Sequence, residues 1–178
     1  MNKKIELISK LSNANGAPGF EDEVVNVIKE NLDSDIFDVN EDKLRNVYAS
    51  YKGKRRDDSK ITLMLDAHSD EVAFIVQAIK DNGLIKFLPL GGWIPYNVSA
   101  QKVRIRNNAN QYITGIISSK PPHFMSEEEK NRPVSIGQLF IDVGGTSRDE
   151  VINKFGIEVG APVIPDVDFE YNEINDTI

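Results

Sequence analysis

The sequence has 178 residues, with 21 lysines and arginines against 28 aspartates and glutamates, so its formal net charge is -7. This length predicts one domain, or one domain with an insertion, and a content of 40% apolar and 28% charged residues is ordinary for a globular protein. The acidic balance argues against a general nucleic-acid or anionic-membrane binder, and the absence of cysteine excludes disulfides, thiolate metal sites and cysteine nucleophiles.

Two short amphipathic helices are predicted at the start of the chain. Ile5, Ile8 and Leu11 share one helical face, and the glycines and proline within residues 13–19 should end that helix. The acids at 21–23 suit the positive end of a second helix, whose apolar stripe is Val24, Val25, Ile28 and Leu32. Each helix has one apolar face, so each needs a sheet or another helix to cover it.

Short apolar runs typical of strands follow at residues 36–39, 46–51 and 61–65. The last run, ITLML, is nearly continuous in apolar character, as in a strand that is buried on both faces. We therefore expect it at the centre of an α/β sheet. The charged stretch 52–58 is too short for a nucleic-acid patch, and a solvated loop explains it better.

After Asp70 the pattern changes to strands, at residues 72–79, 84–88, 102–106, 112–117, 138–143 and 157–159. The Asn82-Gly83 turn predicts a hairpin, and Ser147 and Glu150 have the spacing of a capping box that starts a short helix through residue 154. Residues 102–106 (KVRIR) carry a basic face that could bind an anion, although a half-exposed strand of a small barrel is the simpler explanation. Residues 162–178 contain two prolines and scattered acids, and we expect a connection there.

The sequence contains only two histidines, His68 and His123. His68 follows the predicted buried strand, at the sheet edge where α/β folds place their sites, and Asp70 is close enough to orient its ring. His68 is therefore a candidate metal ligand; the alternative is a polar strand end bonded to the backbone. A zinc site needs three or four ligands, and no other motif supplies such a set. His123 lies in a proline turn, where a structural role is the simpler explanation.

A family resemblance adds to this pattern. Residues 67–72 (AHSDEV) resemble the ligand motif of the glutamyl aminopeptidase / cellulase M-like family of dinuclear metallopeptidases. Further matches occur in the same order along the chain, at 15–23 (NGAPGFEDE), 42–47 (DKLRNV), 90–93 (LGGW), 119–123 (SKPPH) and 140–144 (FIDVG). Several ordered motifs are far more specific than the His-x-Asp spacing alone.

The resemblance implies an α/β catalytic domain, with a mixed sheet and flanking helices, interrupted by an inserted all-β, barrel-like dimerisation domain. Residues 1–70 would belong to the catalytic domain, 71–162 to the insertion and 163–178 to the return. In the complete enzyme two divalent ions, zinc or cobalt, would activate a water to cleave the N-terminal peptide bond, and this chain alone need not bind either ion. His68 would bind one ion, and Asp70 would be the catalytic-centre residue that orients it.

The resemblance also implies an enzyme that acts on peptides and forms dimer-based homo-oligomers, including tetrahedral particles. The sequence itself favours a cytoplasmic protein without nucleic-acid or membrane partners. The N-terminal residues 1–6 lack the apolar core of a signal peptide, and no run approaches the roughly 20 apolar residues that span a bilayer.

In this family the bridging aspartate, the catalytic glutamate and the remaining ligands follow the insertion, and residues 163–178 do not reach them. The resemblance therefore implies the N-terminal portion of a longer aminopeptidase, inactive alone, or a degenerate short member. The alternative is a non-catalytic oligomerisation or regulatory module. A glycosidase, as the cellulase label suggests, would need two carboxylates flanking the scissile bond, and no such pair stands out.

Overall fold

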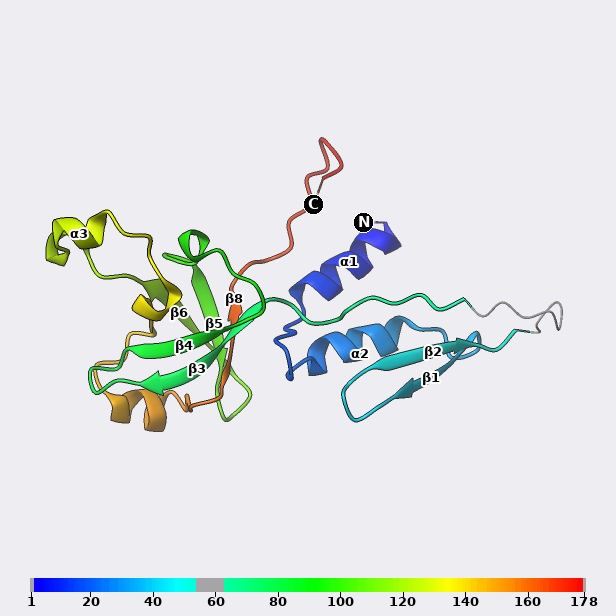
Figure 1. Ribbon diagram of the computed structural model, residues 1–178. Helices are drawn as coiled ribbons and strands as arrows, with labels where there is room; N and C mark the ends of the chain where they lie inside the picture. Colours follow the sequence, from blue (N-terminus) through cyan, green and yellow to red (C-terminus); the bar gives the residue numbers. More distant parts are fainter. Residues whose placement is uncertain (1, 54–62, 178) are drawn as a thin grey trace. The chain divides into compact units, whose positions relative to one another are not determined.

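The computed structural model describes residues 2–53 and 63–177 (Figure 1). It divides into two compact units: Met1–Asp70 with Asp168–Ile178, here called the first unit, and Glu71–Val167, here called the barrel unit. The barrel unit extends beyond Pro162, where the sequence-based boundary lies. Among the described residues no helix has the length and apolar character needed to cross a membrane.

The two predicted helices of the first unit are present. Helix α1 spans Lys3–Asn13, and the Asn2 side chain caps it by accepting a hydrogen bond from the Lys4 amide at 3.0 Å. Helix α2 spans Asp22–Asn31 and starts with acidic residues, which the helix dipole favours. Val24 and Val25 of α2 are buried. All residues of α1 are described, and none of them is buried.

The two predicted strands after the helices form an antiparallel hairpin, β1 (Phe37–Glu41) with β2 (Val47–Tyr51). The Asp42 carboxylate closes the turn by accepting from the amides of Leu44 at 2.9 Å and Asn46 at 3.0 Å. The Arg45 guanidinium then joins the hairpin to α2, because it lies 2.7 Å from both Asp22 and Glu41.

The prediction of a buried central strand at residues 61–65 is wrong for its described part. Residues 61 and 62 lie outside the described residues. Leu63, Met64 and Leu65 form no strand and are 80%, 78% and 88% exposed. A strand buried on both faces needs sheet neighbours and covering layers, and in the described part of the first unit β1 and β2 pair only with each other. The parallel sheet expected beneath His68 is likewise absent from the described residues.

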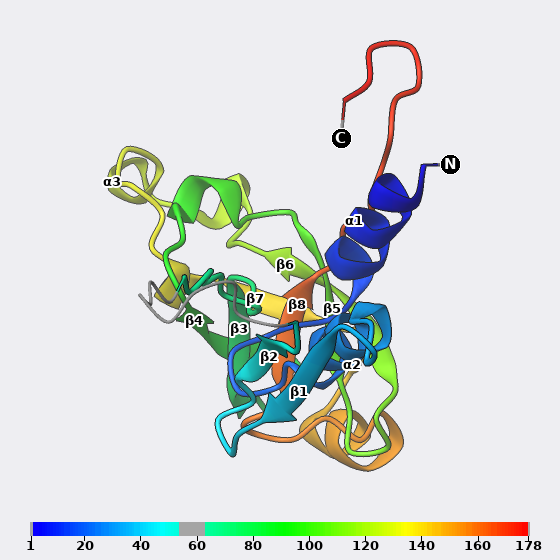
Figure 2. The ribbon, with the colours of Figure 1, turned by 90° about the vertical axis from the view of Figure 1, so that its right-hand side faces the viewer.

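The barrel unit contains six antiparallel strands that close on themselves (Figure 2). In spatial order around the barrel they are β3 (Ala73–Ile79), β4 (Ile85–Leu90), β7 (Phe140–Asp142), β6 (Tyr112–Ser118), β5 (Lys102–Arg106) and β8 (Pro162–Pro165). The predicted hairpins β3–β4 and β5–β6 are confirmed. Gly83 occupies the positive φ of 85° that the first turn requires. Closure gives every strand a partner on both sides, which removes sheet edges.

The barrel encloses one continuous apolar core. Phe74 lies at its centre, stacked on Trp93 with 4.5 Å between ring centroids and edge-on to Phe87 at 4.9 Å. The Trp93 indole donates to the Ala73 carbonyl at 3.0 Å, so its polar atom is satisfied. The other fully enclosed members include Ile85, Val103, Ile105, Ile117, Ile141 and Val163.

Two sequence-based expectations about the end of the barrel unit are wrong. Residues 157–159 form no strand, because Gly156 and Gly160 adopt positive φ on either side of them. Residues 162–165, expected within a connection, instead form β8, which pairs with both β3 and β5 and closes the barrel. The two prolines occupy the two ends of this strand, the positions that tolerate proline best.

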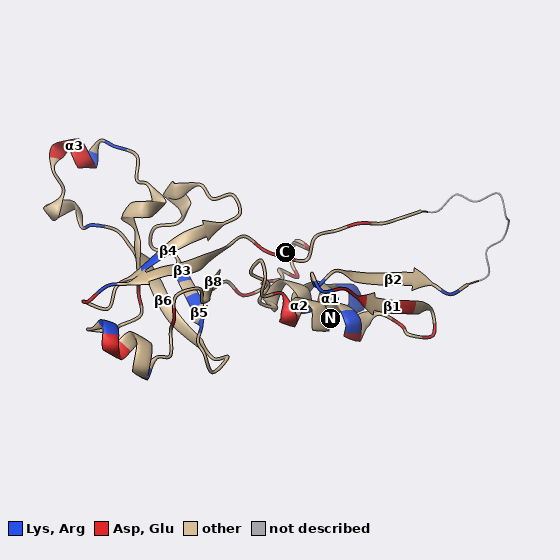
Figure 3. Ribbon diagram, turned by 60° about the horizontal axis from the view of Figure 1, so that its bottom comes forward, with Lys and Arg blue, Asp and Glu red and all other residues tan. Residues whose placement is uncertain are grey.

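The barrel unit also contains short helical turns. These are η1 (Pro95–Asn97), η2 (Pro122–Phe124), α3 (Glu127–Lys130), η3 (Ile136–Gln138) and the π-helical turn η4 (Glu150–Lys154). Helix α3 begins with three glutamates, Glu127, Glu128 and Glu129, which are red in Figure 3. The helix predicted at 147–154 therefore exists as a π-helical turn. Ser147 caps it through its hydroxyl, 3.2 Å from the Glu150 amide, while the Glu150 carboxylate accepts from Thr146 instead of Ser147.

Candidate functional site

His68 lies in the irregular segment that ends the first part of the first unit, and its ring contacts Asp70. The imidazole Nδ1 is 2.9 Å from the Asp70 backbone oxygen and 3.3 Å from the Asp70 carboxylate oxygen Oδ1. A carbonyl oxygen can only accept, so Nδ1 donates in this contact, and in the neutral imidazole the lone pair is then on Nε2. The His68 side chain is 84% exposed. The two residues singled out from the sequence thus lie together, with the imidazole open to a ligand.

This geometry fits one ligand position at a divalent ion, since a histidine ligand normally donates its second ring N–H to a carbonyl or carboxylate. A complete zinc site takes three or four protein ligands. Within residues 2–53 and 63–177, no group of three or more histidine, aspartate or glutamate side chains could hold an ion. The described residues therefore fit one corner of a metal centre and do not complete it.

A buried loop of the first unit contacts the segment that carries His68. Asn15, Gly16 and Ala17 are all buried, and a Cβ placed on Gly16 would lie 3.2 Å from the Ser69 carbonyl oxygen. The loop belongs to the motif at 15–23, which the sequence pattern assigned only to the end of one helix and the start of the next. Its contact with Ser69 joins positions far apart in the sequence, so no local pattern indicates it.

The two alternative sites weighed from the sequence have structural explanations. His123 lies exposed in the turn η2, as expected for a turn residue. Strand β5 is half-exposed, with Val103 and Ile105 buried, and on its basic face Asp166 lies 3.6 Å from the Lys102 ammonium and 3.8 Å from Arg104 Nε. The prediction of a half-exposed strand in a small barrel is therefore confirmed.

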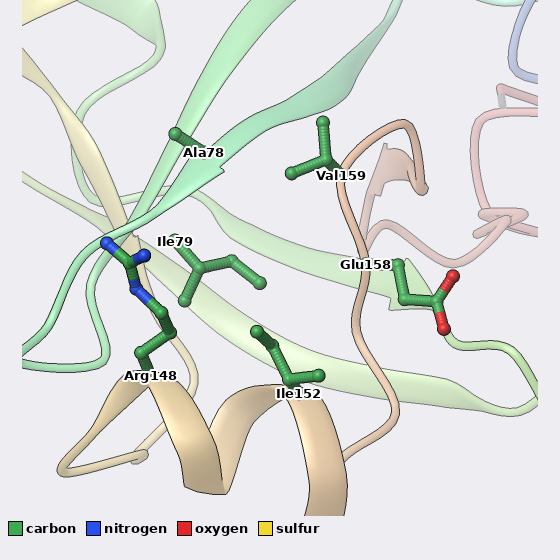
Figure 4. Close-up of a pocket in the computed structure, with 6 residues that line it drawn as sticks. All are labelled: Ala78, Ile79, Arg148, Ile152, Glu158 and Val159. Carbon is green, nitrogen blue, oxygen red and sulfur yellow. The ribbon is translucent and has the colours of Figure 1, made fainter.

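The barrel unit has a shallow hollow of about 300 Å³, lined by Ala78, Ile79, Arg148, Ile152, Glu158 and Val159 (Figure 4). In Figure 4 the aliphatic side chains of Ile79 and Ile152 lie between the two charged groups. Arg148 pairs with Asp81 at 3.0 Å, and Glu158 accepts from Asn108 at 3.3 Å. Both charges thus have partners, and the lining contains no nucleophile or histidine.

Comparison with known proteins identifies the family of this chain. The family model of the M42 glutamyl aminopeptidases matches residues 46–177. The chain belongs to the M42 glutamyl aminopeptidase family. The resemblance found from the motifs is therefore confirmed, and so is the fold class of an α/β segment with an all-β barrel.

The M42 relatives match almost all of this chain. Putative aminopeptidase FrvX of Escherichia coli is 33% identical over 165 residues, which are 93% of this chain and 45% of FrvX. Lysyl aminopeptidase of Pyrococcus furiosus is 30% identical over 161 residues, 87% of this chain and 43% of that protein. The crystal structure of a TET aminopeptidase from a marine sediment archaeon of the Thaumarchaeota has a TM-score of 0.87 at 35% identity, covering 98% of this chain and 48% of that one. This M42 chain thus spans about half the length of the relatives that it matches.

Proposed function

We propose that this chain is the N-terminal part of a metal-dependent aminopeptidase that removes N-terminal residues from peptides in the cytoplasm. The observation that carries the proposal is the His68 ring, whose Nδ1 lies 2.9 Å from the Asp70 carbonyl oxygen while its side chain is 84% exposed. Membership of the M42 family and the aminopeptidase names of similar proteins support the same activity.

In this proposal His68 is a metal ligand through Nε2, and Asp70 is the residue of the catalytic centre that holds the ring. The hydrogen bond from Nδ1 to Asp70 fixes the tautomer and raises the basicity of the free nitrogen. The ions, two zinc or cobalt ions in the complete enzyme, would supply an activated water for attack on the peptide carbonyl. The chain's own contribution is to present one oriented lone pair.

We further propose that the 178-residue chain is inactive alone. The described residues contribute one candidate metal ligand, His68, and no cluster of carboxylates that could complete a two-ion centre. A single imidazole cannot bring together an activated water and a general base, and general-base catalysis requires the base within hydrogen-bond reach of that water.

The test is hydrolysis of aminoacyl anilides with added zinc or cobalt. The 178-residue chain should show no turnover, whereas the protein translated from a reading frame that continues past codon 178 should show it and should lose it in the His68→Gln variant. Robust turnover by the short chain would contradict the claim that it is inactive. An extended protein that is folded, binds zinc and hydrolyses no anilide or peptide would contradict the aminopeptidase itself.

A second candidate is a non-catalytic oligomerisation or regulatory module, with the barrel unit as its dimerisation domain. Large apolar side chains on that unit favour it, since Ile94, Tyr96 and Phe124 are all exposed and exposed apolar groups often mark interfaces. In either case we propose dimer-based homo-oligomers. Light scattering should report a mass at least twice the 19.9 kDa of one chain. A chain that stays monomeric at all concentrations would contradict the proposed oligomer for both candidate functions.

A further inference from the structure

Residues 15–17 of the loop between α1 and α2 are buried, which is unusual because loops normally lie at the surface, where water satisfies their backbone groups. Here a carboxylate replaces that water. The Asn15 amide and the Asn15 side-chain Nδ2 both donate to Glu23 Oε2, at 3.1 Å and 2.7 Å. Glu23 lies in the first turn of α2. These two hydrogen bonds fix the start of the loop to the helix.

The next residue, Gly16, lies between α2 and the segment that carries His68. A Cβ on Gly16 would meet Val24 Cγ2 at 2.8 Å and the Ser69 carbonyl oxygen at 3.2 Å. The first distance is shorter than real Cβ contacts and the second is tighter than most, so a larger residue would require the Val24 side chain to move and the Ser69 carbonyl to shift by a few tenths of an ångström. Glycine, which has no Cβ, fits this place without such a shift.

His68 needs such a support because little else holds it. Its side chain is 84% exposed, and it makes two polar contacts with Asp70, two residues further along the same segment. The direction of its free nitrogen is therefore set by the backbone from His68 to Asp70. Ser69, whose carbonyl faces Gly16, is the central residue of that backbone.

We propose that the loop 15–17 is a positioning element for His68, in which Glu23 fixes Asn15 and Gly16 sets the place of the Ser69 carbonyl. This inference rests on the proposed function, since it concerns the same candidate ligand. Gly16 and Glu23 are positioning residues. They act through the backbone at Ser69 and so have no need to touch the metal or the substrate.

The test uses the imidazole NMR signals of the 178-residue chain, which has only two histidines. His68 belongs to the first unit and His123 to the barrel unit, so His123 is an internal reference. The Gly16→Ala variant should shift the His68 ring signals without metal. It should also raise the zinc concentration that gives the half-maximal shift of His68 by about 10-fold, as loss of an orienting contact does in metal sites. The His123 signals should not move.

The matched control is Gly137→Ala, because a Cβ on Gly137 meets nothing within 4 Å. This variant should leave both histidines unchanged. Glu23→Ala, which removes both hydrogen bonds to Asn15, should reproduce the Gly16→Ala effect, and Glu23→Gln, which keeps an acceptor of the same length, should restore most of the wild-type signal. If Gly16→Ala does not fold, the pair of Glu23 variants decides.

Folded Gly16→Ala and Glu23→Ala variants with wild-type His68 signals and a wild-type zinc response would overturn the positioning role. A wild-type His68 that ignores zinc would instead overturn the proposed function. In that case the metal-free His68 ring signals still test the positioning role.

Discussion

The two units of this chain differ in how completely they bury their own apolar surface. In the barrel unit every strand has two neighbours, and the enclosed cluster includes many side chains with no exposure, such as Phe74 and Ile141. In the described part of the first unit the buried apolar side chains are Ala17, Val24 and Val25. A closed sheet satisfies its own hydrogen bonds and core, whereas amphipathic helices and a two-stranded hairpin depend on further layers. The candidate ligand thus lies on the unit that is less complete.

The largest expected contrast comes from truncating a large aliphatic side chain in each unit. Ile141→Ala removes a residue with 0% exposure from the barrel core, and such changes cost about 2–5 kcal/mol. Leu65→Ala alters a residue that is 88% exposed, where substitutions change stability by about 0.5 kcal/mol or less. Urea unfolding of both variants measures the difference, with Trp93 fluorescence reporting on the barrel unit and helical circular dichroism on the first unit. Equal losses would show that the burial contrast does not govern stability.

A smaller effect is expected from adding one methyl group to the barrel. A Cβ on Gly115 would lie 2.7 Å from Ile141 Cγ2 and 3.1 Å from Val143 Cγ1, so Gly115→Ala should cost about 1–3 kcal/mol through overpacking. The control is Gly92→Ala, where a Cβ meets nothing within 4 Å. Thermal unfolding of the two variants measures the difference. A Gly115→Ala variant as stable as Gly92→Ala would mean that the barrel interior is loosely packed.

The charged contacts of the first unit should contribute less again. Arg45→Gln removes the ion pairs with Asp22 and Glu41, both 2.7 Å long and partly exposed. Pairs of this kind contribute about 0.2–1 kcal/mol each and are screened by salt. The loss measured by urea unfolding at low salt should therefore fall toward zero at high salt. A loss that persists at high salt would point to packing by Arg45 instead of charge.

The smallest predicted effect is a pH dependence in the barrel unit. The hydrogen bond from Lys154, together with those from Thr146, lowers the pKa of Glu150 from 4.5 to about 2. Because the folded state lowers this pKa, the stabilisation is present above pH 4.5 and is lost as the pH falls through about 2. The stability difference between wild type and Glu150→Gln should therefore shrink over this acid range. A difference that is independent of pH would contradict the ionic contribution.

Local signals predicted much of the fold. The helices, both hairpins and the capped turn at Ser147 follow from periodicity, turn glycines and capping residues, each of which acts within a few positions. The exposure of residues 63–65 could not be predicted in this way, because burial of a strand depends on sheet neighbours that are distant in the sequence. The strand β8 was missed because its prolines suggested a connection, although prolines at strand ends leave the internal hydrogen bonds intact.

The candidate site was predictable to the same extent. The spacing of His68 and Asp70 indicated their contact, since two residues of separation bring the groups within reach. The role of the Asp70 backbone carbonyl as the closer acceptor depends on the local bend of the chain, which spacing does not encode. The approach of Gly16 to Ser69 depends on the packing of the loop against α2, and this is a tertiary contact.

The most direct test of this account is a zinc titration of the wild-type 178-residue chain, followed by the ring nitrogen signals of its two histidines. The account predicts that the Nε2 signal of His68 shifts with zinc and that its Nδ1 stays protonated toward Asp70, while His123 on the barrel unit does not respond. A His68 signal that stays unchanged throughout the titration, or two histidines that respond alike, would contradict the assignment of His68 as the ligand that this chain contributes.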